Sequence, residues 1–236
     1  MDPNELNKAT IPMTWPIPRM REKIQENLKG VKWMCQFDFV SMFWQIPLHE
    51  DSRKLFSFYA GDLGTYKFHR VAMGALNSSI YTQRLVERMF SNVIRKDGKP
   101  LLDNGLLVLT DDVLLYAQTQ EEMLEILELF MHAISCHKLA MHPGKCKIFC
   151  TETVFCGHHV SRQGVTVDPE RLAGLVNISP PRHVGDVWQF NSAAGWIRED
   201  VPLFSEAVAT LSDLVTQALK KSKKRNMAHA KRITLK

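Results

Sequence analysis

The sequence lacks any apolar run long enough to span a bilayer, and its N-terminus lacks a signal-peptide pattern. Its five cysteines are an odd number without the spacing of a disulfide framework. A reduced, intracellular protein is the simplest interpretation. Residues 220–236 contain no acidic residue at all. The sequence therefore argues against a membrane-spanning helix and against a small secreted fold held by disulfides.

The basic character of the chain lies mainly at its C-terminus. The formal net charge is +5, but residues 220–236 hold eight Lys and Arg residues, which leaves −3 for the rest. Such a tail can attract nucleic acid by releasing counterions from the phosphates. It can equally be a solvated terminus or the edge of a longer chain. The remaining composition, 45% hydrophobic and 23% charged over 236 residues, predicts one large globular domain or two small ones.

Two adjacent aspartates, Asp111 and Asp112, stand between the apolar runs 106–109 and 113–116. Two short apolar strands joined by Thr110 and the acidic pair predict a β-hairpin with charge at its tip. Neighbouring carboxylates near a core are costly unless a cation or a proton compensates them. Oxygen ligands of this kind suit Mg²⁺. The alternative without a catalytic role is that Asp111 and Asp112 belong to an ordinary exposed turn.

A third carboxylate, Asp38, interrupts the β-prone run 33–40. Aspartate is depleted in strands, so its position favours a function, although a strand-end residue is the bland alternative. If this strand lies beside the hairpin, Asp38 and Asp111 can meet across 73 positions and clamp two metal ions. Such a pair of ions stabilises both the attacking and the leaving oxygen in phosphoryl transfer.

The order of predicted elements indicates an α+β fold. Prolines make Thr10–Met20 extended, whereas helices are expected at Met20–Leu28 and Asn77–Arg95. Another helix begins after a Thr119–Glu122 capping box, with an apolar face predicted at Met123, Leu127, Phe130, Met131 and Ile134. Strands are expected at 147–150 and 154–160, and helices at 182–196 and 202–219. This order predicts a split β-α-β antiparallel sheet with helices on one face.

At this point the sequence resembles a reverse transcriptase, most closely those of gypsy-class long-terminal-repeat retrotransposons. The resemblance covers roughly residues 2–212, and its motifs occur in the family's order. They are Asn7–Thr10 with Trp15–Pro18, Phe37–Ile46, Gly64–Phe68, Met73-Gly74, Asn77, Gln83–Leu85, Leu109–Asp112, Lys145–Phe149 and Phe155–Ser161 with Gly164 and Val167–Pro169. The fold implied is a right-hand polymerase palm with truncated fingers and a small helical thumb.

The resemblance implies the site residues and their roles. Asp38 and Asp111 would be the principal metal ligands, with Asp112 as a supporting acid, for two Mg²⁺ ions that Mn²⁺ can replace. The reaction would be attack of a primer 3′-hydroxyl on the α-phosphate of a deoxynucleoside triphosphate. Lys145 could protonate or screen the pyrophosphate, although an exposed surface lysine is the plain alternative.

Further residues take their roles from the same resemblance. Phe43 would be the sugar gate, a role compatible with simple core packing, and Met73 and Gln83 would face the nucleotide and the template. Cys156, Gly157 and His158 would belong to the primer grip. Zinc is an alternative for Cys146, Cys150, Cys156, His158 and His159, but close two-residue cysteine pairs are lacking.

The resemblance also implies a domain layout and partners. Partial fingers are expected at 1–32 and 44–77, the palm at 33–43 and 78–162, thumb-like or connection-like helices at 163–219, and the basic tail at 220–236. The partners would be an RNA or DNA primer–template and deoxynucleoside triphosphates, with no membrane. The family implies a cytoplasmic particle or the nucleus.

The sequence departs from the family pattern at several places. The upstream basic residues of the fingers and the ribonuclease H domain are expected to be missing, and Asn4 stands where an arginine is usual. Leu109, Thr110 and Ser79 also replace the usual residues. Fewer donors to the triphosphate should weaken its binding. Reduced polymerase activity is therefore expected. The alternatives are a catalytically silent nucleic-acid-binding remnant and a polyprotein piece that acts only when joined to its other domains.

Overall fold

The computed structural model describes residues 3–16, 18–198, 200–220 and 226–235. It divides into two units, 1–166 and 167–236. Ile17 of the Trp15–Pro18 motif, and Lys221, Lys223, Lys224, Arg225 and Lys236 of the basic tail, lie outside the described residues.

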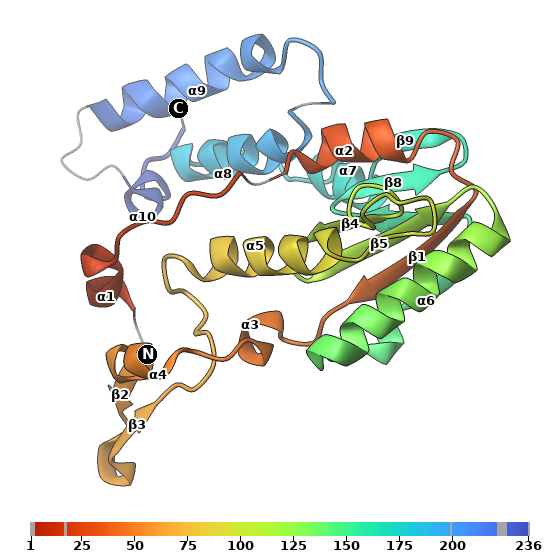
Figure 1. Cartoon of the computed structure of the whole chain (residues 1–236). Coiled ribbons are helices and arrows are strands. Elements are labelled where there is room, and N and C mark those ends of the chain that lie inside the picture. The colour runs from red at the N-terminus through yellow and green to blue at the C-terminus, as the bar shows by residue number, and fades with distance from the viewer. Residues whose placement is uncertain (1–2, 17, 199, 221–225, 236) are drawn as a thin grey trace. The chain divides into compact units, whose positions relative to one another are not determined.

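The first unit is built on a four-stranded sheet of order β4-β5-β1-β6, in which the neighbours are antiparallel (Figure 1). The strands are β1 (Trp33–Asp38), β4 (Leu106–Leu109), β5 (Asp112–Ala117) and β6 (Lys147–Cys150). The predicted β-α-β order and antiparallel sheet are therefore confirmed, and so is the strand at 147–150. A β-hairpin and a distant strand thus form one platform.

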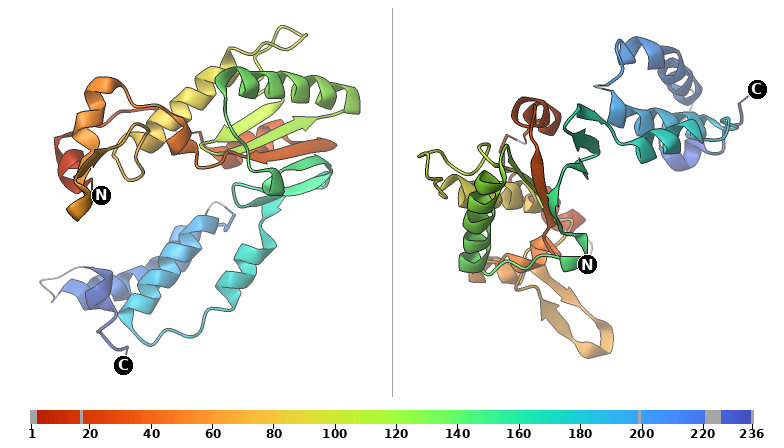
Figure 2. Two further views of the ribbon diagram at one scale, coloured as in Figure 1. Left: turned by 90° about the horizontal axis from the view of Figure 1, so that it is seen from below. Right: turned by 90° about the vertical axis from the view of Figure 1, so that its right-hand side faces the viewer.

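Alternation along the strands divides the core into two clusters, one on each face of this sheet. One cluster contains Cys35, Phe37, Leu106, Val108, Val113 and Leu115 together with residues of α5 (Ser78–Ser91) and α6 (Gln120–His137). The other contains Met34, Leu107, Leu114 and Tyr116 together with residues of α2 (Met20–Asn27). Burial on both faces explains why β4, and β5 from Val113 to Ala117, are continuous apolar runs. Figure 2 shows α5 and α6 running along one face.

Most predicted helices of this unit are confirmed, with changes at their ends. α2 ends one residue early, beside Gly30 at a φ of 75°, and α5 ends at Ser91 rather than Arg95. The Thr119 side chain caps α6, but the Glu122 carboxylate accepts the N–H of Gln118 rather than that of Thr119. The capping box is therefore only half formed, because Glu122 also pairs with Arg95.

Two predictions for this unit are wrong. Met131 is 45% exposed, because the buried stripe of α6, which includes Phe130 as predicted, continues through Ile126 and Ala133 rather than Met131. Residues 154–160 do not form one strand. They form a hairpin of β7 (Glu152–Phe155) and β8 (His158–Ser161), to which β9 (Gly164–Val167) adds a third strand. The strand is broken because Cys156 and Gly157 both have positive φ and make a tight turn.

The segment of residues 42–67 consists of short elements joined by irregular backbone. It holds α3 (Met42–Gln45), α4 (Glu50–Arg53) and the two-stranded sheet of β2 (Ser57–Tyr59) and β3 (Thr65–Lys67), with short 3₁₀ turns at Lys54–Phe56 and Gly61–Leu63. The short helix α1 (Asn4–Ala9) was not predicted. Residues 11–16 and 18–19 form neither helix nor strand. The backbone is extended at Thr10 and Arg19, in line with the expectation from the prolines.

The second unit is helical. It contains α7 (Pro169–Val176), α8 (Val184–Ala194) continued by a 3₁₀ turn at Gly195–Ile197, α9 (Phe204–Lys220) and α10 (Met227–Ala230). The helices predicted at 182–196 and 202–219 are confirmed as α8 and α9, whereas α7 and α10 were not predicted. At the start of α7, the N–H of Glu170 donates to the Asp168 carboxylate and the N–H of Leu172 donates to the Asp168 carbonyl.

The C-terminal segment 226–235 folds into this second unit. Ala230 is completely buried, and Ile233 and Leu235 pack with Val184 and Leu219. The N–H of Val184 donates to the Ile233 carbonyl at 2.9 Å, and the N–H of Leu235 donates to the Arg182 carbonyl at 2.9 Å. Residues 226–235 of the basic tail are therefore packed into the fold and do not form a solvated terminus.

Candidate active site

The three candidate carboxylates come together where β1 and the β4–β5 hairpin end. Asp38 and Asp112 are direct cross-strand partners at the ends of β1 and β5. Asp111 lies in the two-residue turn between β4 and β5, and its carbonyl accepts the N–H of Phe39 at 2.9 Å. The turn is tight because Leu109 pairs with Asp112, and Thr110 takes a φ of 56°. The register of the sheet thus brings Asp38 and Asp111 to the same end of the sheet, although 73 positions separate them in the sequence.

The carboxylates influence one another electrostatically. Burial raises the pKa of Asp112, and the negative charges of Asp111 and Asp38 raise it further, while Lys145 opposes this rise. A carboxyl group whose ionisation is disfavoured by neighbouring carboxylates is relieved by a bound cation. The site is therefore poised for positive charge.

Lys145 supplies one such charge. It closes the 3₁₀ turn Pro143–Lys145, and its Nζ lies 3.1 Å from both carboxylate oxygens of Asp38. The Lys145 side chain is 60% exposed, whereas that of Asp38 is 21% exposed. The alternative for Lys145 was an exposed surface lysine. In the structure the Lys145 side chain is exposed and is also paired with Asp38.

Hydrogen bonds hold the turn that carries Lys145 to the end of β1 and to helix α3. The N–H of His142 donates to the Asp38 carbonyl at 2.9 Å, and the N–H of Lys145 donates to the His142 carbonyl at 3.0 Å. The Gln45 side chain accepts the N–H of Ala140 at 2.6 Å and donates to the carbonyls of Val40 and Ala140. Gln45 was not predicted as a site residue, although it lies within the Phe37–Ile46 motif.

Gln83 supports the aspartate hairpin from behind. Its side chain is 2% exposed. Its Oε1 accepts the N–H of Thr110 at 2.7 Å, and its Nε2 donates to the Val108 carbonyl at 3.2 Å and to Glu87 at 2.8 Å. The described contacts of Gln83 are thus with the protein itself, and its predicted contact with a nucleotide or template stays a prediction.

Glu87 extends this network to the N-terminal segment. Its second carboxylate oxygen accepts the indole N–H of Trp15 at 2.6 Å, and the Arg84 guanidinium lies 5.2 Å from the centre of the Trp15 ring. Trp15 and Gln83 came from separate sequence motifs. The structure joins them in one chain of contacts that ends at the aspartate turn.

The other predicted site residues lie at different places. Phe43 in α3 is half-buried against the core, and Met73 is 59% exposed. Cys156 and Gly157 form the turn of the β7–β8 hairpin, and His158 follows them. Strand β7 reaches β1 through a hydrogen bond from Thr153 to Gln36. The described contacts do not bring these five residues to the aspartates, and their roles stay predictions.

Within the described ranges, no group of three or more His, Cys, Asp or Glu side chains is arranged to hold a metal ion. This includes the cysteines and histidines of 146–159. Mg²⁺ commonly takes only one or two carboxylates and completes its shell with waters and substrate phosphates. Asp38 and Asp111, with Asp112 adjacent, are the oxygen donors that would hold Mg²⁺ at this end of the sheet.

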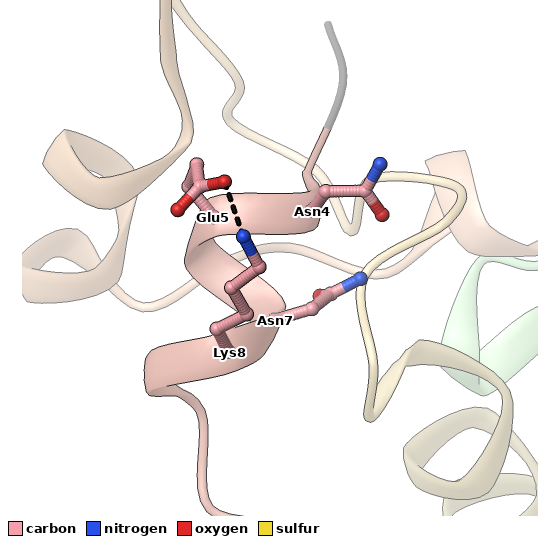
Figure 3. Close-up of a pocket in the computed structure, with 4 residues that line it drawn as sticks. All are labelled: Asn4, Glu5, Asn7 and Lys8. Atoms are coloured by element: carbon pink, nitrogen blue, oxygen red, sulfur yellow. Dashed lines mark hydrogen bonds and ion pairs between the residues drawn. The ribbon is translucent and has the colours of Figure 1, made fainter.

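A separate open hollow of about 640 Å³ lies along α1 and is lined by Asn4, Glu5, Asn7 and Lys8 (Figure 3). Lys8 pairs with Glu5 at 2.6 Å. The Asn7 amide donates to the Gly74 carbonyl and accepts the N–H of Leu76. Asn7 therefore fastens α1 to the segment after Met73, which accounts for this residue structurally.

Comparisons with known proteins identify the family of the chain. The family model described as "Reverse transcriptase (RNA-dependent DNA polymerase)" matches residues 1–160. The chain belongs to the reverse transcriptase family. The predicted resemblance and the α+β polymerase palm are thus confirmed.

Among curated relatives, the chain is 27% identical over 224 residues to the retrovirus-related Pol polyprotein from transposon 297 of Drosophila melanogaster, covering 95% of this chain and 20% of the relative. It is 25% identical over 215 residues to the Pol polyprotein from transposon gypsy of the same organism, covering 91% and 20%. The chain therefore spans about a fifth of the length of these relatives.

Solved structures of reverse transcriptases share the fold. A foamy viral protease–reverse transcriptase in complex with double-stranded DNA aligns with a TM-score of 0.79 at 22% identity, covering 92% of this chain and 36% of that chain. The same type of protein in complex with an RNA/DNA hybrid gives 0.76 at 23%, covering 92% and 28%. None of the described helices of this chain is long and apolar enough to cross a membrane.

Proposed function

We propose that this chain is an RNA-directed DNA polymerase domain that extends a primer by two-metal nucleotidyl transfer. The observation that carries the proposal is the register of β1 and β5, which sets Asp38 opposite Asp112 with Asp111 in the adjoining turn. A sheet end bearing three carboxylates is suited to gathering divalent cations and triphosphate oxygens. Membership of the reverse transcriptase family supports the same reaction.

The side chains divide the work as follows. Asp38 and Asp111 would hold the two metal ions, and Asp112 would add negative charge beside them. When bound, Mg²⁺ ions lower the pKa of the primer hydroxyl and neutralise charge on the leaving pyrophosphate. Lys145, whose ammonium already lies at the cluster, donates a proton or its charge to that pyrophosphate. Phe43 fills the space of a ribose 2′-hydroxyl.

The partners follow from the reaction. We propose an RNA or DNA primer–template and deoxynucleoside triphosphates as substrates, with Met73 beside the nucleotide and Cys156, Gly157 and His158 at the primer end. The solved foamy viral relatives of the same fold are complexes with double-stranded DNA and with an RNA/DNA hybrid. These complexes support a duplex partner for this chain.

Primer extension on an RNA template, with Mg²⁺ and then with Mn²⁺, tests the proposal. The Asp111→Asn, Asp112→Asn double variant is the control for contaminating polymerase. We expect extension by the native chain at a reduced rate, because the sequence offers few cationic donors to the triphosphate. The variant should lose at least about 100-fold more, because it loses several kcal/mol of charge stabilisation. Extension that persists in the variant would assign the activity to a contaminant.

The alternative is a catalytically silent chain that binds nucleic acid. Leu109 and Thr110, which precede the aspartates in place of the usual residues, favour this alternative. Binding of primer–template without extension in either metal would support it over the polymerase.

A further inference from the structure

We propose that the Lys145 ammonium is the resident counter-cation of Asp38 and must leave that carboxylate before a divalent metal ion can bind there. This inference rests on the proposed two-metal function. It adds a coupling that the function itself does not require, namely that metal binding releases Lys145.

The geometry of the ion pair is the first argument. Lys145 Nζ is 3.1 Å from both Oδ1 and Oδ2 of Asp38, so the ammonium bridges the carboxylate rather than contacting one edge of it. Mg²⁺ binds carboxylate oxygen lone pairs at about 2.1 Å, and the ammonium occupies one of the lone pairs on each oxygen. An ammonium that engages both oxygens competes for those lone pairs, and its positive charge repels the incoming ion.

The second argument is that the lysine can move while its backbone stays fixed. The N–H of Lys145 donates to the His142 carbonyl, and the N–H of His142 donates to the Asp38 carbonyl. Gln45 holds the preceding Ala140 through its side chain. The Lys145 side chain itself is 60% exposed, so rotation of its own bonds can carry the ammonium off Asp38 without unfolding the turn.

The third argument is that the exchange places a proton donor where the reaction needs one. A lysine released from Asp38 stays tethered within one side-chain length of the carboxylates. Negative charge develops on the leaving pyrophosphate at the same place. The ammonium then passes from the carboxylate to the phosphate, so that metal binding prepares the leaving-group side of the site.

Metal affinity tests the inference independently of catalysis. Mn²⁺ binding to the full chain is measured by titration calorimetry for the native protein and for Lys145→Ala. Because the Lys145 end of the competing pair is 60% exposed and screened by water, its removal should tighten Mn²⁺ binding by only about two- to fivefold. Lys145→Arg keeps the competing cation and should bind no more tightly than the native chain.

Lys147→Ala is the matched control for long-range charge. Lys147 is exposed, lies two residues away and contacts Thr153 rather than an aspartate. Equal tightening by Lys147→Ala and Lys145→Ala would show a general charge effect and overturn the inference. Unchanged or weaker binding in Lys145→Ala would also overturn it.

A second readout follows the lysine directly. Amine acylation followed by mass spectrometry compares Lys145 with Lys147 as Mn²⁺ is added. We expect Lys145 to become more reactive as the metal saturates the site, with Lys147 unchanged. In Asp38→Asn, Lys145 should be reactive from the start and insensitive to metal. Constant reactivity of Lys145 in a native protein saturated with Mn²⁺ would contradict the exchange.

The two hypotheses fail in different ways. Absence of Mn²⁺ binding in both the native chain and Lys145→Ala, or binding that survives Asp38→Asn and Asp111→Asn unchanged, contradicts the two-metal function and the inference with it. Binding that needs both aspartates but is indifferent to Lys145→Ala leaves the function standing and removes only the exchange.

Discussion

Gln83 shows how much a single buried amide can do beside a charged turn. It accepts the N–H of Thr110 and donates to Val108 and Glu87, so it ties helix α5 to strand β4 and to the turn of the aspartate hairpin. Thr110 holds a left-handed backbone conformation at the same turn, which a non-glycine residue adopts only when its surroundings impose it. The amide therefore helps to hold Asp111 in place.

The Gln83→Ala variant should lower the free energy of unfolding by about 1–3 kcal/mol, because it leaves the buried partners of the amide unsatisfied. Urea denaturation followed by circular dichroism measures the change. The control is Arg88→Ala, at an exposed position of the same helix, which should change stability by less than about 0.5 kcal/mol. Equal stabilities of the two variants would show that the amide does not brace the hairpin.

At the scale of elements, the C-terminal segment 226–235 packs against helix α8. A Cβ added at Gly185 would lie 2.7 Å from the Lys231 nitrogen and 2.9 Å from its Cα. Two backbones approach so closely there that only glycine fits. The basic residues at the end of the chain are thus carried on a packed segment, and deleting residues 220–236 would damage the helical unit as well as remove charge.

Gly185→Ala should therefore destabilise the second unit by about 1–3 kcal/mol through overpacking. Gly195→Ala is the matched control, because a Cβ added there would meet no atom within 4 Å and the φ of Gly195 is −56°. That substitution should leave stability unchanged or raise it by up to about 1 kcal/mol. Hydrogen exchange of the α8 and α10 amides reports both effects. Equal protection in the two variants would contradict tight packing of this segment against α8.

At the scale of the whole molecule, charge is distributed unevenly. The chain without residues 220–236 carries −3, so attraction to phosphates depends largely on the C-terminal cations. Of these, Lys220, Lys231 and Arg232 are described and exposed. Because Lys231 and Arg232 sit on a docked segment, their charges have a defined place on the second unit.

The Lys231→Gln, Arg232→Gln double variant should weaken binding to a duplex and reduce the slope of log K against log salt by about one to two units. Fluorescence anisotropy over a range of salt concentrations measures the slope. Lys96→Gln, an exposed lysine of the first unit, serves as the comparison. A slope that stays unchanged in the double variant would show that the docked segment does not reach the phosphates.

Local patterns were sufficient to predict most of the elements. Helices α5, α6, α8 and α9 follow the helical spacing of apolar residues, and the β4–β5 hairpin follows two apolar runs around a short polar turn. Each of these signals lies within a stretch of about 20 residues, so no tertiary information is needed to interpret it. The motifs around Asp38 and Asp111 likewise identified the family from residue types and order alone.

The contacts across the chain needed the tertiary structure. The pairing of Lys145 with Asp38 joins residues 107 positions apart, and nothing in the spacing of either motif indicates which cation meets which acid. The turn at Cys156-Gly157 was mistaken for strand interior because a turn is set by positive φ, which a run of β-prone residues does not reveal. Gln45, Gln83 and the segment 226–235 acquire their roles only through packing, since burial and register decide which polar groups lack water and must find partners in the protein.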